Sequence, residues 1–268
     1  MENKYAYYLI LFLLISTSWM GCQSNQQKMA QVQDSLKAIN SSDSSILIYS
    51  DGLEKLKESL TNKESPVYTK GDYSFYTSIY SQDSVPVLFV EYGEAGDNGF
   101  IEKKYYLDNG ELVLYCEKSK QVSSTEKPVY EFKETRIYFR NNVFLKGEER
   151  IAAGDSLLSQ IPFVLVDDYL LDKNKQFDFK RLEDANAEVG DFNLTFDRID
   201  SLSATKQYLV MANKKANTYE SAYQIIKADS LISKIKENPY AYKGKKLKVQ
   251  HSKQGTRMIY KGGELGAF

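Results

Sequence analysis

The sequence predicts an α+β fold, in which N-terminal helices precede an antiparallel β-meander and a second, small β-rich domain follows. Apolar residues recur at helical spacing in the first part of the chain and then alternate with period two from Val67 to Leu145. Beyond Gly190, three strand-like segments are followed by one helical segment and two further strands. The composition, 42% hydrophobic and 26% charged, is typical of a folded globular chain.

The first 22 residues have the pattern of an export signal. Tyr5 to Ile15 is an unbroken run of aromatic and aliphatic residues. This run is shorter than the roughly 20 residues that a membrane-spanning helix needs, and it matches the apolar region of a secretory signal peptide. The small residue Gly21 then precedes Cys22, and a polar stretch, Gln23 to Gln27, follows. The sequence therefore predicts a signal peptide over residues 1–21.

Gly21, Cys22 and their flanks resemble the cleavage and lipidation site of bacterial lipoproteins. The resemblance implies that residues 1–21 are removed and that Cys22 becomes an acylated first residue, carrying fatty acids such as palmitate. Two features depart from the usual pattern: Trp19 stands where leucine is common, and the N-terminal region has only one lysine beside one glutamate. An ordinary cleaved signal peptide or an uncleaved anchor is the alternative. No acidic cluster follows Cys22, which favours an outer-membrane lipoprotein that faces the periplasm.

The cysteine count and the net charge exclude two classes of protein. Cys22 and Cys116 are the only cysteines, so a lipidated Cys22 leaves Cys116 without a partner in the chain and no disulfide framework supports the fold. The formal net charge is −1. Nucleic-acid binding needs a basic surface over the phosphates, so this balance disfavours a nucleic-acid partner.

The residues after the signal peptide are enough for one large or two modest domains. We predict a polar tether with a short helix over residues 22–45, a helix plus the β-meander over residues 46–150, a helical connector over residues 151–189 and a small α+β domain over residues 190–268. The helix in the tether is predicted from the helical spacing of the apolar residues Met29, Val32, Leu36 and Ile39. The second helix is predicted over Asp51 to Leu60, with Ser50 or Asp51 as its N-cap and Leu53, Leu56 and Leu60 on one face.

Three similar segments predict β-hairpins. Asn109-Gly110 and Asn141-Asn142 each separate an aromatic-rich strand from an apolar one, and Met258 to Leu265 offers a third version around Gly262-Gly263. Asn and Gly tolerate the positive φ that two-residue hairpin loops require. The segments resemble single halves of MORN-type repeats, which would imply a ligand-binding repeat. The separation of 32 residues and the lack of contiguous copies favour ordinary hairpins instead.

The last hundred residues alternate helical and strand patterns. Ile161 to Asp172 is predicted as a buried helix that Pro162 begins, and Lys173 to Ala187 as a loop or short helix. Asp229 is the expected N-cap of a helix that Asn238-Pro239 ends. The predicted strands are Phe192 to Ile199, Gln207 to Ala212, Tyr219 to Ile226 and Tyr242 to Val249. Three strands, a helix and two strands resemble a small OB-like barrel.

The residues that carry chemistry are sparse, and we expect no metal, no cofactor and no enzyme activity. His251 is the only histidine, so a catalytic triad would depend on it alone, and we interpret it as a surface residue at a strand end. One histidine and one free cysteine cannot close a zinc site. An EF-hand frame from Asp172 to Glu183 has Phe177 where glycine is required. The alternative is a hydrolase of cell-wall or dietary glycans that uses scattered carboxylates such as Glu148-Glu149 or Asp167-Asp168.

We therefore predict a membrane-anchored envelope lipoprotein that binds a protein, peptide or glycan partner. Tyr106 and Tyr138 are the candidate binding residues. Adjacent strand residues point to opposite faces, so one ring of Tyr105-Tyr106 lies outside the face that packs on the core. A tyrosine ring offers apolar area and a polar tip, which suits recognition. The alternative is that a helix around Leu53 to Leu60 covers that face and that both rings are core.

Overall fold

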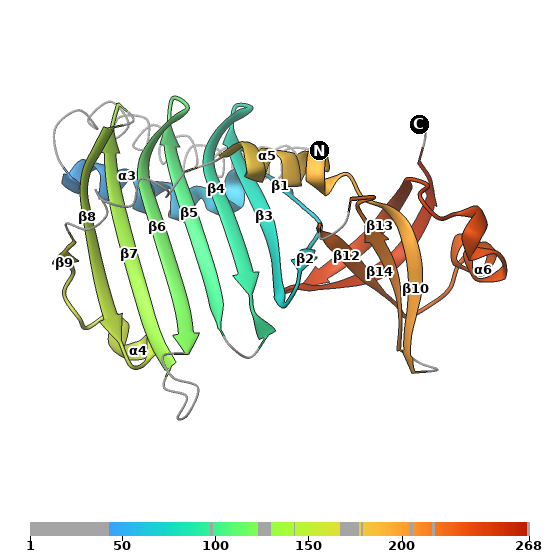
Figure 1. The fold of residues 1–268 in the computed structure, drawn as a ribbon. Helices are drawn as coiled ribbons and strands as arrows, with labels where there is room; N and C mark the ends of the chain where they lie inside the picture. Colours follow the sequence, from blue (N-terminus) through green and yellow to red (C-terminus); the bar gives the residue numbers. More distant parts are fainter. Residues whose placement is uncertain are drawn as a thin grey trace, which may run out of the picture. The chain divides into compact units, whose positions relative to one another are not determined.

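The computed structural model describes residues 43–96, 99–122, 130–141, 143–166, 177, 179–203, 206–215 and 218–266. The chain divides into two compact units, Met1–Ser59 and Leu60–Phe268. The described part is β-rich and contains a large mixed sheet (Figure 1). This confirms the β-rich character of the predicted fold. The signal peptide, Cys22 and the tether helix lie outside the described residues.

In the first unit, the helix α3 (Asp43–Leu56) is followed by the short 3-10 helix η1 (Lys57–Ser59). The predicted start at Asp51 is wrong, because the helix begins eight residues earlier, at Asp43. Ile46, Tyr49 and Leu53 recur at helical spacing and are each only 1% exposed, so burial of this face accounts for the earlier start. The acidic Asp43 in the first turn also suits the positive end of the helix dipole.

The predicted β-meander is present in the second unit. Each of its strands pairs antiparallel with the next one along the chain. Asn109 and Gly110 have φ of 51° and 84°, and Asn141 has φ of 51°, so the two asparagine hairpins form as predicted. The strands are β3 (Tyr73–Gln82), β4 (Val85–Glu94), β5 (Phe100–Asp108), β6 (Glu111–Val122), β7 (Tyr130–Arg140) and β8 (Val143–Ala152).

One face of the meander packs against the helix α5 (Phe179–Ala187). Leu182 of α5 and the aromatic rings of Phe177 and Phe179 lie on this face, and Phe179 contacts Tyr105 at 5.5 Å between ring centroids. Of the two alternatives predicted for Lys173 to Ala187, a loop or a short helix, the structure has the helix from Phe179 onwards. The meander residues buried here are Phe89, Tyr105, Leu107, Leu112, Tyr115, Ile137 and Phe139.

The predicted helix from Ile161 to Asp172 is wrong over its described part. Val164–Leu165 form the short strand β9, which pairs with Glu148 and Glu149 of β8. Phe163 explains the extended backbone, because its ring lies under the guanidinium groups of Arg136 and Arg150, at 4.1 and 4.5 Å. A one-turn helix, α4 (Asp155–Leu158), precedes this segment.

The C-terminal strands form a ring of hydrogen-bonded neighbours. β10 (Thr195–Ser203) pairs with β11 (Lys206–Ala212), and β11 with β12 (Glu220–Ile225). β12 runs parallel to β14 (Arg257–Leu265), which pairs antiparallel with β13 (Leu247–Gln254). Phe196 closes the ring: its N–H donates to Lys245 O at 2.9 Å, and its carbonyl accepts from the N–H of Gly244 at 2.8 Å. The interior holds buried residues such as Leu209, Met211, Leu247 and Met258.

The third predicted hairpin is wrong, because Met258 to Leu265 lies within the single strand β14. The turn falls at Gly255, with φ of 58°, where Gln254 pairs with Arg257. Gly263 stays extended and serves close packing instead: a Cβ there would lie 3.0 Å from Tyr260 Oη and 3.1 Å from Leu231 Cδ2.

The two parts of Leu60–Phe268 are joined through short strands. β1 (Thr61–Glu64) and β2 (Tyr68–Lys70) both pair with β3, and β2 also pairs with β12. The division between compact units falls after Ser59, and the domain boundaries at residues 151 and 190 stay predictions. None of the helices in the described part of the chain has the length and apolar character needed to span a bilayer.

Asp229 caps the helix α6 (Ser230–Glu237), as predicted. Its carboxylate accepts hydrogen bonds from Ile232 N at 2.9 Å, Tyr260 Oη at 2.8 Å and Gly263 N at 3.3 Å. Asp229→Ala should lower the free energy of unfolding by about 1–2 kcal/mol, because the cap is lost and two further donors lose their acceptor. Urea unfolding measures this, with the exposed Glu264→Ala as the control. A loss below about 0.5 kcal/mol would contradict the capping role.

Candidate functional site

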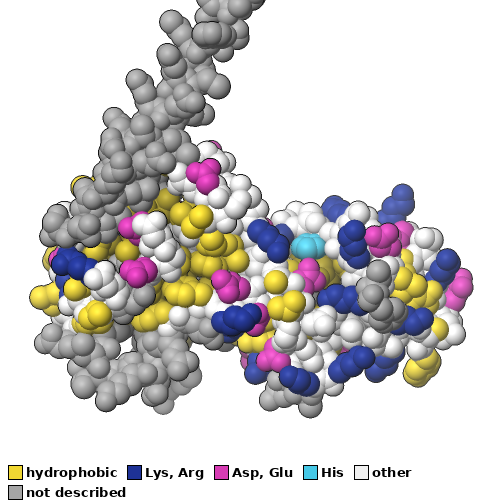
Figure 2. All heavy atoms as spheres, turned by 90° about the horizontal axis from the view of Figure 1, so that it is seen from above, with side chains coloured by type: hydrophobic (Ala, Val, Ile, Leu, Met, Phe, Trp, Pro, Cys, Tyr) yellow, Lys and Arg dark blue, Asp and Glu magenta, His cyan; other side chains and the backbone are white. Residues whose placement is uncertain are grey.

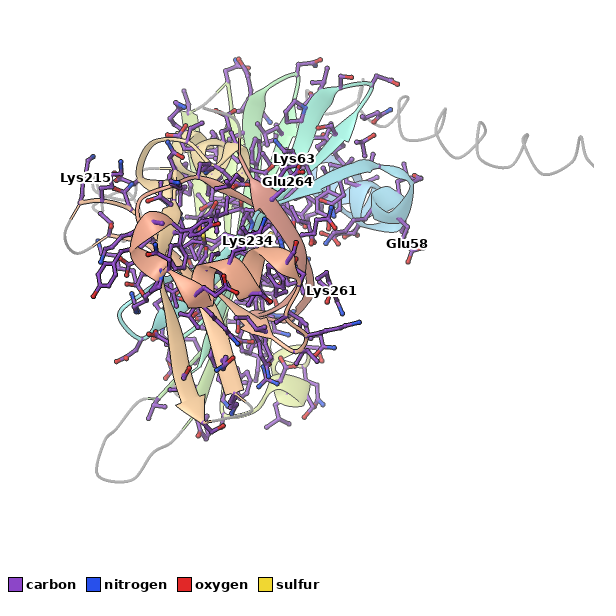
Figure 3. All side chains as sticks on the ribbon, turned by 90° about the vertical axis from the view of Figure 1, so that its right-hand side faces the viewer. Glu58, Lys63, Lys215, Lys234, Lys261 and Glu264 are labelled. Atoms are coloured by element: carbon purple, nitrogen blue, oxygen red, sulfur yellow. The ribbon has the colours of Figure 1, made fainter. Side chains whose placement is uncertain are left out.

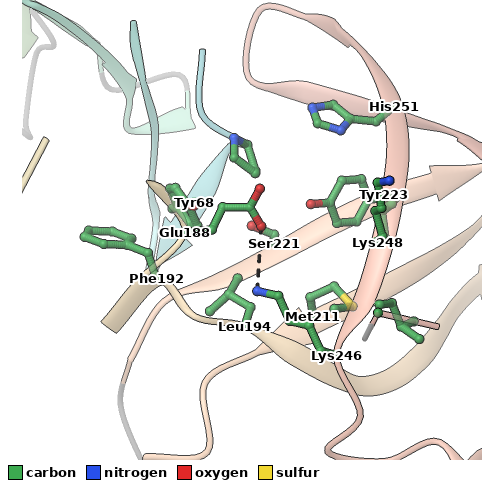
Figure 4. Close-up of a pocket in the computed structure, with 14 residues that line it drawn as sticks. Tyr68, Glu188, Phe192, Leu194, Met211, Ser221, Tyr223, Lys246, Lys248 and His251 are labelled. Atoms are coloured by element: carbon green, nitrogen blue, oxygen red, sulfur yellow. Dashed lines mark ion pairs between the residues drawn. The ribbon is translucent and has the colours of Figure 1, made fainter. Parts of the chain in front are cut away.

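A pocket of about 350 Å³ opens beside the ring of C-terminal strands (Figure 4). Its walls combine aliphatic, aromatic and charged side chains that come from β2, from the turn after α5 and from β11, β12 and β13. Such a combination of apolar lining and a few converging polar groups is usual for small-ligand sites. The lining residues are Pro66, Tyr68, Glu188, Phe192, Leu194, Met211, Ser221, Tyr223, Lys246, Leu247, Lys248, Val249, His251 and Gly266.

Glu188 holds the most unusual backbone position of the pocket. It follows the last residue of α5 and has φ of 55°, the left-handed conformation in which glycine is usual at this place. Val189 N–H donates to Asp184 O at 3.0 Å and Glu188 N–H to Ala185 O at 3.4 Å, the hydrogen bonds of a Schellman motif. A β-carbon in this conformation costs about 1–2 kcal/mol, and a negative charge at a helix C-terminus is also unfavourable. Figure 4 shows the carboxylate directed into the pocket.

Lys246 brings a positive charge next to this carboxylate. It precedes β13, and its Nζ lies 3.7 Å from Glu188 Oε2 (Figure 4, dashed line). That separation exceeds a normal N–H···O distance of about 2.7–3.2 Å. Lys246 Nζ instead donates to Asn193 Oδ1 at 3.0 Å. No hydrogen bond to the Glu188 carboxylate occurs among the described residues, so its oxygens can accept from a ligand.

The wall opposite Glu188 is polar. Ser221 and Tyr223 alternate along β12, and the Tyr223 hydroxyl points into the pocket below the His251 imidazole (Figure 4). The two rings are 5.3 Å apart in an edge arrangement. Burial raises the pKa of Tyr223, and Glu188 raises it further, so this phenol stays neutral. Ser221 is fully buried and donates to Val67 O at 2.7 Å, which makes it a poor nucleophile.

The remaining walls are apolar. The aliphatic part consists of Leu194, Met211, Leu247, Val249 and Pro66. The aromatic rings of Tyr68 and Phe192 are packed on each other at 4.7 Å and are only 1% and 3% exposed.

Lysine and arginine are frequent around the pocket. Residues 190–268 contain 14 Lys and Arg against seven Asp and Glu. Figure 2 shows basic side chains gathered around the chain's only histidine, and Figure 3 shows Lys215, Lys234 and Lys261 projecting outwards. Lys248 Nζ lies 3.4 Å from Glu264 Oε1, and both side chains are largely exposed. The basic excess therefore lies mostly on the outside of the strand ring, whereas Glu188 and Lys246 balance each other in the pocket.

Sequence reasoning missed this site. His251 was expected at the surface of a strand end, but it lies within β13 and lines the pocket. The period-two spacing of Leu247, Val249 and His251 could have indicated a shared face. Glu188 carried no local signal, because its role depends on a left-handed backbone that sequence spacing does not reveal.

The predicted binding residues are not available to a partner. Tyr106 and Tyr138 are 4% and 0% exposed, so the prediction of an aromatic surface at these rings is wrong. Tyr138 Oη donates to Glu148 Oε1 at 2.6 Å, and Lys146 Nζ lies 4.5 Å from the ring centroid. Both rings thus belong to the interior, as the alternative interpretation expected.

The other predicted sites are not brought together by the structure. Glu148 and Glu149 are adjacent in β8 and point to opposite faces. Cys22, Asp167-Asp168 and residues 172–176 and 178 of the EF-hand frame lie outside the described residues. No cluster of three or more His, Cys, Asp or Glu suited to a metal occurs in the described part of the chain.

Comparison with models of protein families, with curated proteins and with solved structures finds no match for this chain. The functional argument therefore rests on the geometry of the pocket.

The His251 imidazole should titrate below its ordinary pKa of about 6.5. Burial lowers this pKa and the Lys253 ammonium lowers it further, although Glu188 and Glu64 oppose the shift. The unfolded chain then takes up a proton before the folded one, so the contribution to stability is present above pH 6.5 and is lost as the pH falls below it. NMR titration of the single imidazole measures the pKa, and a value above 6.5 would contradict its burial. His251→Gln should reduce the loss of stability between pH 7 and pH 5.

Proposed function

We propose that this chain is a non-enzymatic binding module of the bacterial envelope, held at the membrane by a lipid on Cys22 and binding a small ligand in the pocket around Glu188. The body faces the periplasm from the outer membrane. The pattern of residues 1–22 supports the anchor, and the pocket geometry supports the ligand site. The pocket volume lies at the lower end of the about 300–1,000 Å³ range of ligand pockets, which favours a small molecule or one side chain of a partner.

The conformation of Glu188 is the single observation that best supports the proposal that the pocket binds a ligand. A glycine would be more favourable at φ of 55°, and a neutral residue would be more favourable at the end of α5. Strained residues of this kind cluster at binding and catalytic sites, where the side chain has a use that offsets the local cost. The Glu188 carboxylate points into the pocket that Lys246, Tyr223 and His251 also line, which supports a use in ligand binding.

The arrangement favours binding over catalysis. The buried hydroxyl of Ser221 already donates to Val67 O, and Glu188 is the only carboxylate among the described residues that line the pocket. A glycosidase needs two carboxyl groups about 5–9.5 Å apart, so the pocket lacks the pair that the hydrolase alternative requires. Turnover of a glycan by the purified protein, lost in Glu188→Gln, would contradict the non-enzymatic assignment.

We also propose that residues 190–268 form an OB-like barrel. The connectivity that supports this is β10-β11-β12-β14-β13, closed by the two hydrogen bonds of Phe196, with α6 between β12 and β13. No nucleic-acid ligand is inferred from this likeness.

A screen that uses His251 as the reporter tests the ligand site. The chain has one histidine, so the imidazole gives one set of NMR signals, and any ligand that enters the pocket should shift them. Amino acids, sugars and peptidoglycan fragments are suitable probes. A compound that binds by calorimetry without shifting the imidazole binds elsewhere, and that result would argue against the pocket.

Replacement of Cys22 by serine tests the anchor. Cys22→Ser should move the protein from the membrane fraction to the soluble fraction, because several acyl chains on one residue give stable attachment and serine cannot receive the thioether-linked chains. Cell fractionation and mass spectrometry of the N-terminus measure this. Cys116→Ser is the matched control and should stay with the membrane. A Cys22→Ser protein that keeps residues 1–21 and stays in the membrane would contradict the lipoprotein assignment.

A further inference from the structure

Three charged side chains line the pocket, Glu188, Lys246 and Lys248, and the two that face each other, Glu188 and Lys246, have opposite charges. Glu188 and Lys246 contribute one negative and one positive charge, and Lys248 pairs with Glu264 at the exposed outer side. The imidazole of His251 is half-buried against Tyr223, an environment that disfavours its charged form. A ligand with a net charge would pair with only one of these two partly exposed charges. A ligand that is neutral overall satisfies both.

The positions of the two charges restrict the ligand further. Glu188 Oε2 and Lys246 Nζ are 3.7 Å apart, side by side at the pocket. An α-amino acid carries its ammonium and carboxylate on the same carbon, so its two charges are also side by side. Placed against the pocket, the ammonium can donate to Glu188 and the carboxylate can accept from Lys246. The four charges then alternate in sign, and each hydrogen bond is charge-assisted.

The apolar walls distinguish an amino acid from a sugar. Sugar sites present open aromatic faces, but the Tyr68 and Phe192 rings are packed on each other and buried. Most of the apolar lining residues are aliphatic, namely Leu194, Met211, Leu247 and Val249, and the first three are nearly as buried as the two rings. Such walls match a branched aliphatic side chain.

We propose that the pocket binds a small zwitterion, an α-amino acid with an aliphatic side chain, through Glu188 on its ammonium and Lys246 on its carboxylate. The Tyr223 hydroxyl points into the same pocket and offers the ligand a further hydrogen-bonding group (Figure 4). This inference rests on the proposed ligand site and adds the class of its ligand.

Titration with L-leucine, N-acetyl-leucine and leucinamide tests the proposal in the full folded chain. Leucine should shift the His251 imidazole and bind at least about tenfold more tightly than either blocked compound, because each loses one charge-assisted hydrogen bond. Glu188→Gln should weaken the binding of leucine by about tenfold but should not weaken the binding of N-acetyl-leucine, whose carboxylate is then no longer repelled by Glu188. Lys246→Gln should weaken the binding of leucine but should not weaken the binding of leucinamide, whose ammonium is then no longer repelled by Lys246. Lys261→Gln, on the exposed side of β14, is the control and should bind like the parent.

Three outcomes would contradict the proposal that the ligand is a zwitterionic amino acid. Leucine at tens of millimolar could leave the imidazole unshifted, N-acetyl-leucine could bind as tightly as leucine, or glucose could bind in its place. If another compound shifts the imidazole and loses that effect in Glu188→Gln, the ligand site stands and only the ligand class is wrong. If every ligand found binds without any dependence on Glu188, both proposals are wrong. Thermal unfolding of each variant confirms that the substituted chains are folded.

Discussion

Arg181→Met should lower the free energy of unfolding by about 3 kcal/mol. The guanidinium of Arg181, on α5, pairs with the carboxylate of Glu91, on β4, which is 1% exposed. Removing one partner of a buried ion pair costs about 3–5 kcal/mol, because the other charge is left uncompensated. Lys103 Nζ and Tyr73 Oη also lie near Glu91, each at 3.4 Å, so the loss should fall at the lower end of that range.

The neighbouring Lys180→Met is the matched control for this prediction. Lys180 pairs with Asp184 one turn away, but its side chain is 71% exposed, so the loss should stay below about 0.5 kcal/mol. The double variant Glu91→Gln with Arg181→Met should recover most of the stability, since neither buried charge then remains. Chemical unfolding measures all three. Equal stability of the Arg181 and Lys180 variants would contradict the role assigned to the buried pair.

Glu188→Gly should raise the free energy of unfolding by about 1 kcal/mol. Release of the left-handed strain contributes about 1–2 kcal/mol, and removal of a negative charge from the end of α5 adds about 0.3–1 kcal/mol. The greater freedom of glycine in the unfolded chain opposes this by about 0.4–1 kcal/mol. The exposed ion pair with Lys246 is lost, which has little effect at 3.7 Å.

Ser84→Gly is the control for the backbone part of this prediction. Ser84 has φ of 67° in the turn between β3 and β4 and does not line the pocket. Glycine at this position should therefore stabilise the protein by releasing the same left-handed strain, with no effect on the pocket. A loss of stability in Glu188→Gly together with a gain in Ser84→Gly would show that Glu188 has a structural role, and the functional argument from strain would fall.

The elements that local chemistry determines could be predicted from the sequence. The hairpins at Asn109-Gly110 and Asn141 form because these residues accept positive φ, and α6 begins at Asp229 because that side chain accepts the first N–H groups. Gly262-Gly263 shows the limit of the same reasoning, since glycine there provides space for Tyr260 and Leu231 and makes no turn.

The candidate site could not be predicted because it is assembled from distant segments. The position of Glu188 in the pocket depends on how α5 ends, and that of Lys246 depends on the segment before β13. The positions of Tyr223 and His251 depend on the pairing of β12 and β13 with β14. Tyr106 and Tyr138 were predicted from local pattern alone, and both are interior because residues on either face of the meander are buried. Spacing along a strand indicates which residues share a face but does not indicate which face is covered.

The most direct test of the ligand site measures stability and ligand binding on the same Glu188→Gly protein. The expected result is a gain of about 1 kcal/mol in the free energy of unfolding, together with loss of the ligand-induced shift of the His251 imidazole. A protein that is no more stable than its parent and still shows the full shift would contradict the account.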